Sequence, residues 1–148
     1  MIYVEAPNKI QPVDYVKKSI FLAGGITGCG EWQSHIAEEL ADTDLVVLNP
    51  RRKDFPINDP TAAYEQIKWE FENLRFADQI LFWFPPETLC PIVLFELGAW
   101  SMTTKPIFIG IHPNYQRKQD VEIQIGFVRP DVKICYSLTE LANQVIAG

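Results

Sequence analysis

Four short apolar runs recur along the chain and constrain its fold more than any other feature. The runs occupy residues 20–23, 45–48, 80–84 and 107–111. Each is rich in β-branched or aromatic side chains, as is typical of strands in a parallel sheet that is covered on both faces. Shorter apolar segments at residues 2–4 and 132–135 are further strand candidates.

Segments with helical periodicity separate these runs. One apolar stripe repeats every four residues within residues 32–40. A second helix is predicted to start at Asp59, as cap, and Pro60, at the first helical position. Its predicted apolar stripe consists of Tyr64, Ile67, Phe71 and Leu74. Ser137 and Glu140 have the spacing of a capping box and predict the start of the last helix.

The alternation of strand and helix predicts right-handed crossovers and a doubly wound α/β fold. We expect a Rossmann- or flavodoxin-like parallel sheet of about five strands flanked by helices. The chain has 148 residues, the usual length of one domain, so residues 1–148 are expected to form a single domain. Ligands of such sheets bind beyond the carboxyl ends of the strands. The loops expected there are residues 24–30, 49–55, 85–91 and 112–119.

Charge and cysteine content narrow the class of protein. The formal net charge of −6 argues against a nucleic-acid polymer as partner, whereas a small nucleotide stays compatible with it. The three cysteines are scattered, and neither histidine has metal-ligand spacing from a cysteine, so we expect no metal and a reduced, cytoplasmic protein. No signal peptide is recognisable and no apolar run has the length of a membrane span, so no membrane partner is expected.

Glu96 is the first candidate for chemistry. It is the one polar side chain in the segment PIVLFELGAW, residues 91–100. An unpaired charge in apolar surroundings costs several kcal/mol, so something must compensate it. A helix starting near Pro91 would place Glu96 within two turns of unpaired backbone N–H groups, which favour an anion. A structural carboxylate that caps a loop or pairs with an arginine is the alternative.

The predicted second helix carries two further candidates. Helical geometry places Glu70 at the border of the apolar stripe and Glu72 toward water. Glu70 is a candidate general acid, and a half-buried surface glutamate is the alternative. Trp69 points almost opposite the stripe, so it is expected to cover a base, to contact another subunit, or to be a singly exposed tryptophan.

The glycine-rich segment AGGITGCG, residues 23–30, follows a predicted strand and precedes a helix. Its backbone N–H groups can cradle a phosphate or a sugar hydroxyl, although a tight turn explains it equally well. It matches neither the dinucleotide fingerprint nor the P-loop. Arg51 and Arg52 follow Asn49 and Pro50 at another strand end; one is a candidate anion ligand and the other a solvated side chain.

The order and spacing of four motifs resemble a known family. IFLAGGITG, NPRR, QIKWEFENLRFADQILFWFP and LFELGAW are similar to the nucleoside 2-deoxyribosyltransferase-like superfamily, and within it to the 2-deoxyribosyltransferase-like branch. The resemblance covers nearly the whole chain. It implies an enzyme of nucleotide metabolism that needs no cofactor and forms a homodimer or a larger homo-oligomer with shared sites.

The resemblance also implies roles for single residues. Glu96 corresponds to the nucleophile, and Glu70 to the acid, which is usually aspartate. Phe21 stands where tyrosine is common, and Cys90 where transferases carry aspartate and nucleotide hydrolases serine. Gln124 aligns with a region that reaches a neighbouring subunit. The residues expected to bind substrate are Phe21, Gly24, Gly25, Ile26, Thr27, Asn49, Arg51, Trp69, Cys90 and Gln124.

The expected function is therefore cleavage or exchange of the N-glycosidic bond of a nucleoside or deoxynucleoside through a covalent glycosyl–Glu96 intermediate. Two alternatives stay open. One is a hydrolase, a nucleoside 5′-monophosphate N-glycosidase. The other belongs to a different class: a module that senses a nucleotide without turnover.

Overall fold

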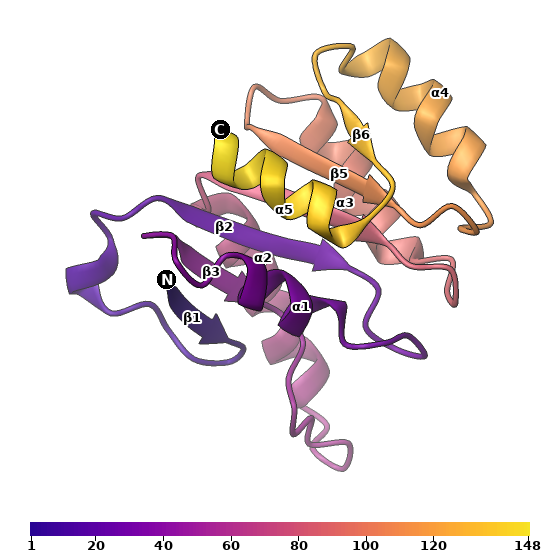
Figure 1. Cartoon of the computed structure of the whole chain (residues 1–148). Coiled ribbons are helices and arrows are strands. Elements are labelled where there is room, and N and C mark those ends of the chain that lie inside the picture. Colours follow the sequence, from indigo (N-terminus) through magenta and orange to yellow (C-terminus); the bar gives the residue numbers. More distant parts are fainter.

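A computed structural model describes all residues of the chain, 1–148, as a parallel sheet between two layers of helices (Figure 1). The strands are β1 (Ile2–Glu5), β2 (Ser19–Gly24), β3 (Val46–Asn49), β4 (Gln79–Phe84), β5 (Ile107–Ile111) and β6 (Ile134–Cys135). The helices are α1 (Trp32–Glu39), α2 (Ala62–Phe76), α3 (Pro91–Ser101), α4 (Lys118–Val128) and α5 (Leu138–Ala147), with a short 3₁₀ turn at Pro12–Asp14.

The strand order β1-β3-β2-β4-β5-β6 is that of a doubly wound sheet, and every pairing is parallel. The prediction of a doubly wound α/β fold is confirmed, with six strands in place of about five. Both short candidate segments are strands, and they form the two edges of the sheet. Edge strands pair on one side only, so they need fewer apolar residues and give a weaker sequence signal.

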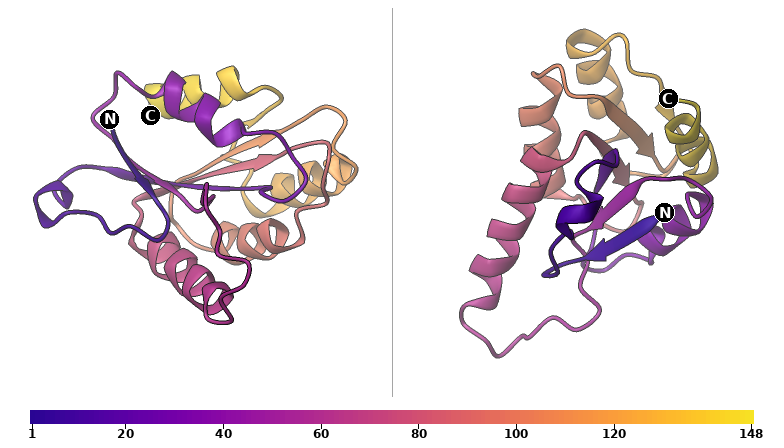
Figure 2. Two further views of the ribbon diagram at one scale, coloured as in Figure 1. Left: turned by 90° about the horizontal axis from the view of Figure 1, so that it is seen from below. Right: turned by 90° about the vertical axis from the view of Figure 1, so that its left-hand side faces the viewer.

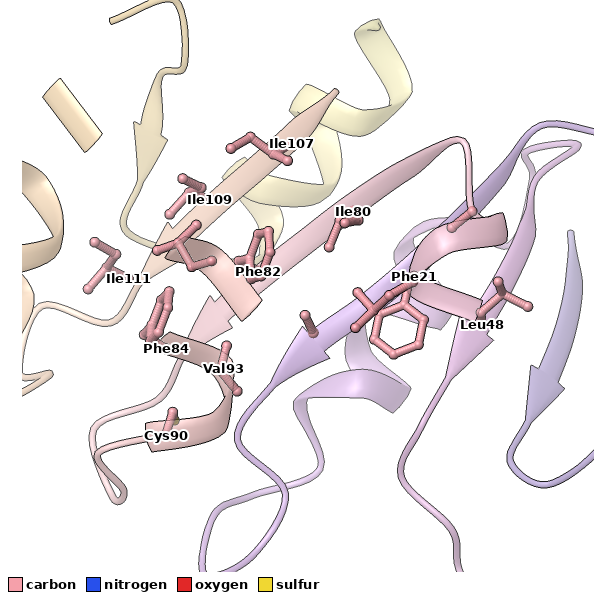
Figure 3. Close-up of a cluster of buried hydrophobic side chains, with 14 of the residues drawn as sticks. Phe21, Leu48, Ile80, Phe82, Phe84, Cys90, Val93, Ile107, Ile109 and Ile111 are labelled. Carbon is pink, nitrogen blue, oxygen red and sulfur yellow. The ribbon is translucent and has the colours of Figure 1, made fainter. Parts of the chain in front are cut away.

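The two helix layers differ in composition. Helices α1 and α5 cover one face of the sheet, and α2, α3 and α4 cover the other (Figure 2). Strand side chains alternate between the two cores, as the pleat requires. In β2, Ile20 and Leu22 pack in the core under α1 and α5, whereas Phe21 and Ala23 pack in the larger core under α2 to α4 (Figure 3).

Two predicted helix starts have different outcomes. Helix α2 begins at Ala62, two residues later than predicted, because Asp59 caps a turn in place of the helix: its Oδ1 accepts hydrogen bonds from the backbone N–H and the hydroxyl of Thr61. The start of α5 is confirmed, since the hydroxyl oxygen of Ser137 accepts a hydrogen bond from the N–H of Glu140.

The predicted core-facing stripe of α2 is wrong. Tyr64, Ile67 and Phe71 point to solvent, with 72%, 65% and 56% of their surfaces exposed. Trp69, expected on the outer side, is buried, and only Leu74 of the predicted stripe joins it in the core. The helix is apolar on two sides, and the periodicity of the sequence does not distinguish a core stripe from an outward one.

No helix of the structure has the length and apolar character needed to cross a membrane.

Candidate functional site

A cavity of about 350 Å³ opens at the carboxyl ends of β2 and β4. From these two neighbouring strands the chain crosses in opposite directions, to β3 and to β5, so their ends form the topological switch point of the sheet. We call this space the switch-point cavity. Its lining residues are Phe21, Ala23, Gly24, Gly25, Ile26, Thr27, Pro50, Glu70, Thr88, Cys90, Pro91, Ile92, Val93 and Glu96.

Most of the residues singled out from the sequence meet in this cavity. Phe21 and the glycine-rich segment come from β2 and the loop after it, Glu70 from α2, and Cys90 and Glu96 from the start of α3. Figure 3 shows Cys90 and Val93 at the beginning of α3, beside the end of β4. Elements far apart in sequence therefore bring both candidate carboxyl groups to one space.

Glu96 lies in the second turn of α3 and is half-buried. Burial, and next to it the charge of Glu70, raise the pKa of the Glu96 carboxyl from 4.5 to about 8. No arginine or lysine pairs with it, so the alternative of a structural ion pair finds no support. A raised pKa favours the protonated form of this carboxyl group near neutral pH.

Glu70 faces Glu96 from α2 and is half-buried, whereas Glu72 is exposed as predicted. The side-chain N–H group of Gln66, one turn earlier, donates a hydrogen bond of 2.8 Å to Glu70 Oε1. Burial raises the pKa of Glu70, and the hydrogen bond from Gln66 opposes that rise. The same Gln66 nitrogen donates to the carbonyl of Pro50 at 2.7 Å.

The two carboxyl groups behave as a pair. Because each ionised group disfavours ionisation of the other, the protons leave in two steps that belong to the pair. Neither lysine, arginine nor histidine lines the cavity, so no cation neutralises the pair. Between its two apparent pKa values the site holds one carboxylate and one proton donor, the combination that attack at a glycosidic carbon and protonation of a leaving group require.

The glycine-rich loop forms one wall of the cavity and is held from behind. Trp32 Nε1–H and Gln33 Nε2–H both donate to the carbonyl of Gly25, at 2.8 and 3.2 Å. A Cβ atom at Gly25 would lie 2.8 Å from Pro85 Cγ and 2.9 Å from Thr88 Cγ2, so only glycine fits there.

Cys90 caps the start of α3 in the left-handed backbone region, with φ of 51°. This conformation costs a non-glycine residue about 1–2 kcal/mol and is concentrated at functional sites. Burial raises the pKa of the Cys90 thiol to about 11, so the group is neutral and weakly nucleophilic. Cys90 therefore contributes shape and a weak hydrogen-bonding group to the cavity wall.

Asn49 and Arg51 do not line the switch-point cavity. They lie in a neighbouring polar depression, in which their side chains hold the backbone. The Arg51 guanidinium donates to the carbonyls of Cys29 and Gly30 at 3.1 and 2.7 Å, and Asn49 Oδ1 accepts from the N–H of Arg51 at 3.0 Å. These hydrogen bonds tie the end of β3 to the glycine-rich loop.

Trp69 and Gln124 also lie outside the cavity. The indole of Trp69 packs in the core against Phe21, with ring centroids 6.1 Å apart, and its N–H donates to the carbonyl of Asn8. It therefore lies behind the cavity wall, and its burial contradicts the expected outward position of this side chain. Gln124 is exposed on α4, beside a groove between α3 and α4.

Two polar residues at the site, Thr88 and Gln66, are not among those predicted from the sequence. Thr88 lines the cavity from the loop after β4, a loop that the strand-end rule had selected as a whole. Gln66 contacts Glu70 from one helical turn away, a spacing at which side chains regularly meet. The fourth selected loop does not reach the cavity, because Tyr115 is buried and its hydroxyl donates to the carbonyl of Leu89 at 2.8 Å.

No three histidine, cysteine, aspartate or glutamate side chains gather in a group that could hold a metal ion.

Comparison with known proteins shows the family of the chain. A family model described as "nucleoside 2-deoxyribosyltransferase like" matches residues 17–115, about two thirds of the chain. The matched segment runs from before β2 to beyond β5 and includes every residue that lines the switch-point cavity. No curated protein matches the chain closely enough to serve as a relative. Because the family match spans most of the chain, the protein belongs to the nucleoside 2-deoxyribosyltransferase-like family, and thereby to the general class of glycosyl-transfer proteins.

Proposed function

We propose that this protein cleaves or exchanges the N-glycosidic bond of a nucleoside or deoxynucleoside, with Glu96 as nucleophile and Glu70 as general acid. The observation that carries the proposal is the pairing of Glu70 and Glu96 in one cavity at the switch point of the sheet. Membership of the family supports the same class of chemistry.

The proposed reaction has two steps. A carboxylate oxygen of Glu96 attacks C1′ of the sugar, the C1′–N bond breaks, and the departing base takes a proton from Glu70. A second base or a water molecule then attacks C1′, the glycosyl–Glu96 ester bond breaks, and Glu70 accepts the proton of the attacking group. A second base gives transfer and water gives hydrolysis, with retention at C1′ in both cases.

Charge in the cavity favours an uncharged nucleoside over a nucleoside 5′-monophosphate. Glu70 and Glu96 are the acidic side chains that line it, no basic side chain does, and Arg51 is engaged with loop carbonyls. A phosphate dianion would face this pair without a countercharge, which is unfavourable at short range. We therefore propose the nucleoside as substrate, with the 5′-monophosphate N-glycosidase as the alternative activity to be tested.

A homo-oligomer is also proposed. Large apolar side chains are exposed on or next to the three helices of one layer, namely Tyr64, Ile67, Phe71, Ile92, Phe95, Met102, Ile123, Phe127 and Val128. We call these residues the α2–α4 face. Exposed apolar surface of this extent marks an interaction site in soluble proteins. A second copy of the chain is the proposed partner, and Gln124 on α4 would lie within that interface.

The proposed function is tested by mass spectrometry of free base. Purified protein is incubated with nucleosides, deoxynucleosides and their 5′-monophosphates, each with and without a second base. Wild type is expected to release base from uncharged nucleosides, and Glu96→Ala to lose at least about 1,000-fold in rate, since it lacks the nucleophile. Dependence on the second base identifies transfer over hydrolysis.

Glu72→Ala is the matched control, because Glu72 lies on the same helix as Glu70 but is exposed. It should keep the wild-type rate. Base release only from 5′-monophosphates would replace the nucleoside by the nucleotide as substrate. Binding of a nucleoside or nucleotide without any base release by folded wild type would contradict the enzyme proposal and favour a sensor.

A further inference from the structure

Gln66 lies between a backbone carbonyl and one of the paired carboxyl groups. Its side-chain nitrogen donates one hydrogen bond to the Pro50 carbonyl at 2.7 Å and a second to Glu70 Oε1 at 2.8 Å. The oxygen of the same amide, Oε1, is buried and has no partner. Pro50 and Glu70 both line the switch-point cavity, so Gln66 supports its wall from behind.

The Pro50 carbonyl fixes which way the Gln66 amide points. A carbonyl oxygen can only accept a hydrogen bond, so it selects the N–H side of the amide. Turning the amide over would bring its oxygen against the Pro50 oxygen and would leave that buried carbonyl unpaired, which is unfavourable. The amide therefore presents an N–H group to Glu70 whether or not Glu70 carries a proton.

We propose that Gln66, oriented by the Pro50 carbonyl, is a positioning residue that holds Glu70 as the carboxylate and so directs the single proton of the pair to Glu96 before substrate binds. A donated N–H forms a stronger hydrogen bond with a carboxylate oxygen than with the carbonyl oxygen of a protonated carboxyl group, so it favours the ionised form. Glu96 has no hydrogen-bond donor of this kind.

The remaining surroundings do not reverse this preference. The β2 end, the glycine-rich loop and Pro50 contribute no charged side chain to the cavity, and the only other titratable group there is the neutral thiol of Cys90. The pKa of Glu96 is raised to about 8 by burial and by Glu70, whereas at Glu70 the Gln66 hydrogen bond works against the rise. Geometry and electrostatics thus agree on the location of the proton.

This location has a consequence for catalysis, which rests on the proposed function. Attack at C1′ requires Glu96 as carboxylate and Glu70 as acid. The proton must therefore pass from the Glu96 carboxyl to the Glu70 carboxylate once substrate has entered. This transfer leaves the net charge of the pair unchanged. Charge developing at C1′ favours the ionised Glu96 and drives this exchange. The protonation state of the empty cavity itself does not depend on any catalytic activity.

The inference is tested by carboxyl ¹³C NMR titration of glutamate-labelled protein, with the two signals assigned from Glu70→Gln and Glu96→Gln. In wild type the Glu96 signal is expected to titrate near the upper pKa and the Glu70 signal at the lower one. Gln66→Met keeps the length of the side chain but removes the N–H donor. It should raise the apparent pKa of Glu70 by about one to two units and lower that of Glu96.

Further comparisons make the test decisive. Unchanged titration of both carboxyl groups in folded Gln66→Met would overturn the proposal, and so would a wild-type Glu96 that titrates below Glu70. Gln66→Ser, too short to reach Glu70, replaces Gln66→Met if the latter does not fold. Glu72→Gln, on the exposed side of α2, should leave both titrations unchanged.

A catalytic readout separates positioning from simple support of the fold. If the protein turns over nucleoside, the acid limb of its kcat/KM profile should move up by the same one to two units in Gln66→Met. A merely structural role would lower the profile without moving it. Loss of all base release in wild type would contradict the proposed function and leave the NMR result unaffected, so the two failures are distinguishable.

Discussion

Glu96 is a carboxyl group that the fold holds in a poorly solvated cavity without a cation. Because its pKa rises from 4.5 to about 8 on folding, the folded chain binds this proton more tightly than the unfolded chain. The stability associated with the protonated group is fully present below pH 4.5 and is lost as pH rises through 8.

Glu96→Gln keeps the shape of the side chain and removes this titration. We therefore expect the variant to become more stable relative to wild type as pH increases from 5 to 9, by on the order of 4 kcal/mol in the limit. Chemical denaturation across this pH range measures the difference. Glu65→Gln, exposed on α2, serves as control and should show a difference that hardly varies with pH. A pH-independent difference for Glu96→Gln would contradict the raised pKa.

The same pair predicts the pH dependence of turnover. The active form carries one proton on two carboxyl groups, so kcat/KM should be bell-shaped. It should fall above about pH 8, where the pair loses its last proton from Glu96. It should also fall on the acid side, where the pair takes up a second proton. Because burial raises the pKa of Glu70, this acid limb is expected above pH 4.5. Initial rates from pH 4 to 10 measure the profile; a rate that keeps rising beyond pH 9 would exclude a required proton on the pair.

The glycine-rich loop is shaped by neighbouring elements as much as by its own glycines. The Arg51 side chain reaches from the end of β3 to the carbonyls of Cys29 and Gly30, and to Gln33 Oε1 at 3.2 Å. Gln33 in turn donates to the carbonyl of Gly25 in the cavity wall. Arg51 thus acts on the cavity through the loop.

Arg51→Gln should loosen this loop without unfolding the domain. The expected result is amide hydrogen exchange at least about tenfold faster in residues 25–31, since hydrogen bonds to a charged donor contribute about 1.5–3 kcal/mol and each 1.4 kcal/mol is tenfold in the opening equilibrium. Exchange in β4 should stay unchanged. Lys53→Gln, an exposed neighbour, is the matched control. Equal exchange in wild type and Arg51→Gln would show that the loop holds its shape without the arginine.

The whole molecule has one helix layer with many exposed apolar side chains and one with few. Phe95 of α3 is 76% exposed on the α2–α4 face, whereas Ile146 is the one large apolar side chain exposed within helices α1 and α5. Burying such a face against a second copy removes apolar surface from water and favours association.

Phe95→Asp should therefore weaken self-association at least about tenfold, because a charge cannot be buried in an apolar contact without a large cost. Sedimentation equilibrium measures the change, and Ile146→Asp is the matched control on the opposite layer. Wild type that stays monomeric at high concentration, or association that is lost equally in both variants, would contradict a self-interface on the α2–α4 face.

Local patterns in the sequence were sufficient to predict the strands of the sheet and many of the residues that line the cavity. Buried strands of a doubly wound sheet must be short and apolar throughout, so β2 to β5 are recognisable in the sequence. Strand ends of a parallel sheet meet at one edge, which is why three of the four selected loops converge on one cavity. A single carboxylate in an apolar segment, Glu96, was recognisable in the sequence and lies in that cavity.

Packing decided what these patterns leave open. An apolar stripe that faces the core and one that faces outward have the same periodicity, so the orientation of α2 and the burial of Trp69 follow only from three-dimensional contacts. Arg51 donates to the carbonyl of Gly30, which lies 21 residues earlier in the sequence. This contact depends on where β3 ends relative to the glycine-rich loop. The protonation of the carboxyl pair has the same origin. It depends on burial, on the approach of α2 to α3, and on the orientation of the Gln66 amide by the carbonyl of Pro50. None of these is a property of residues that are neighbours in the chain.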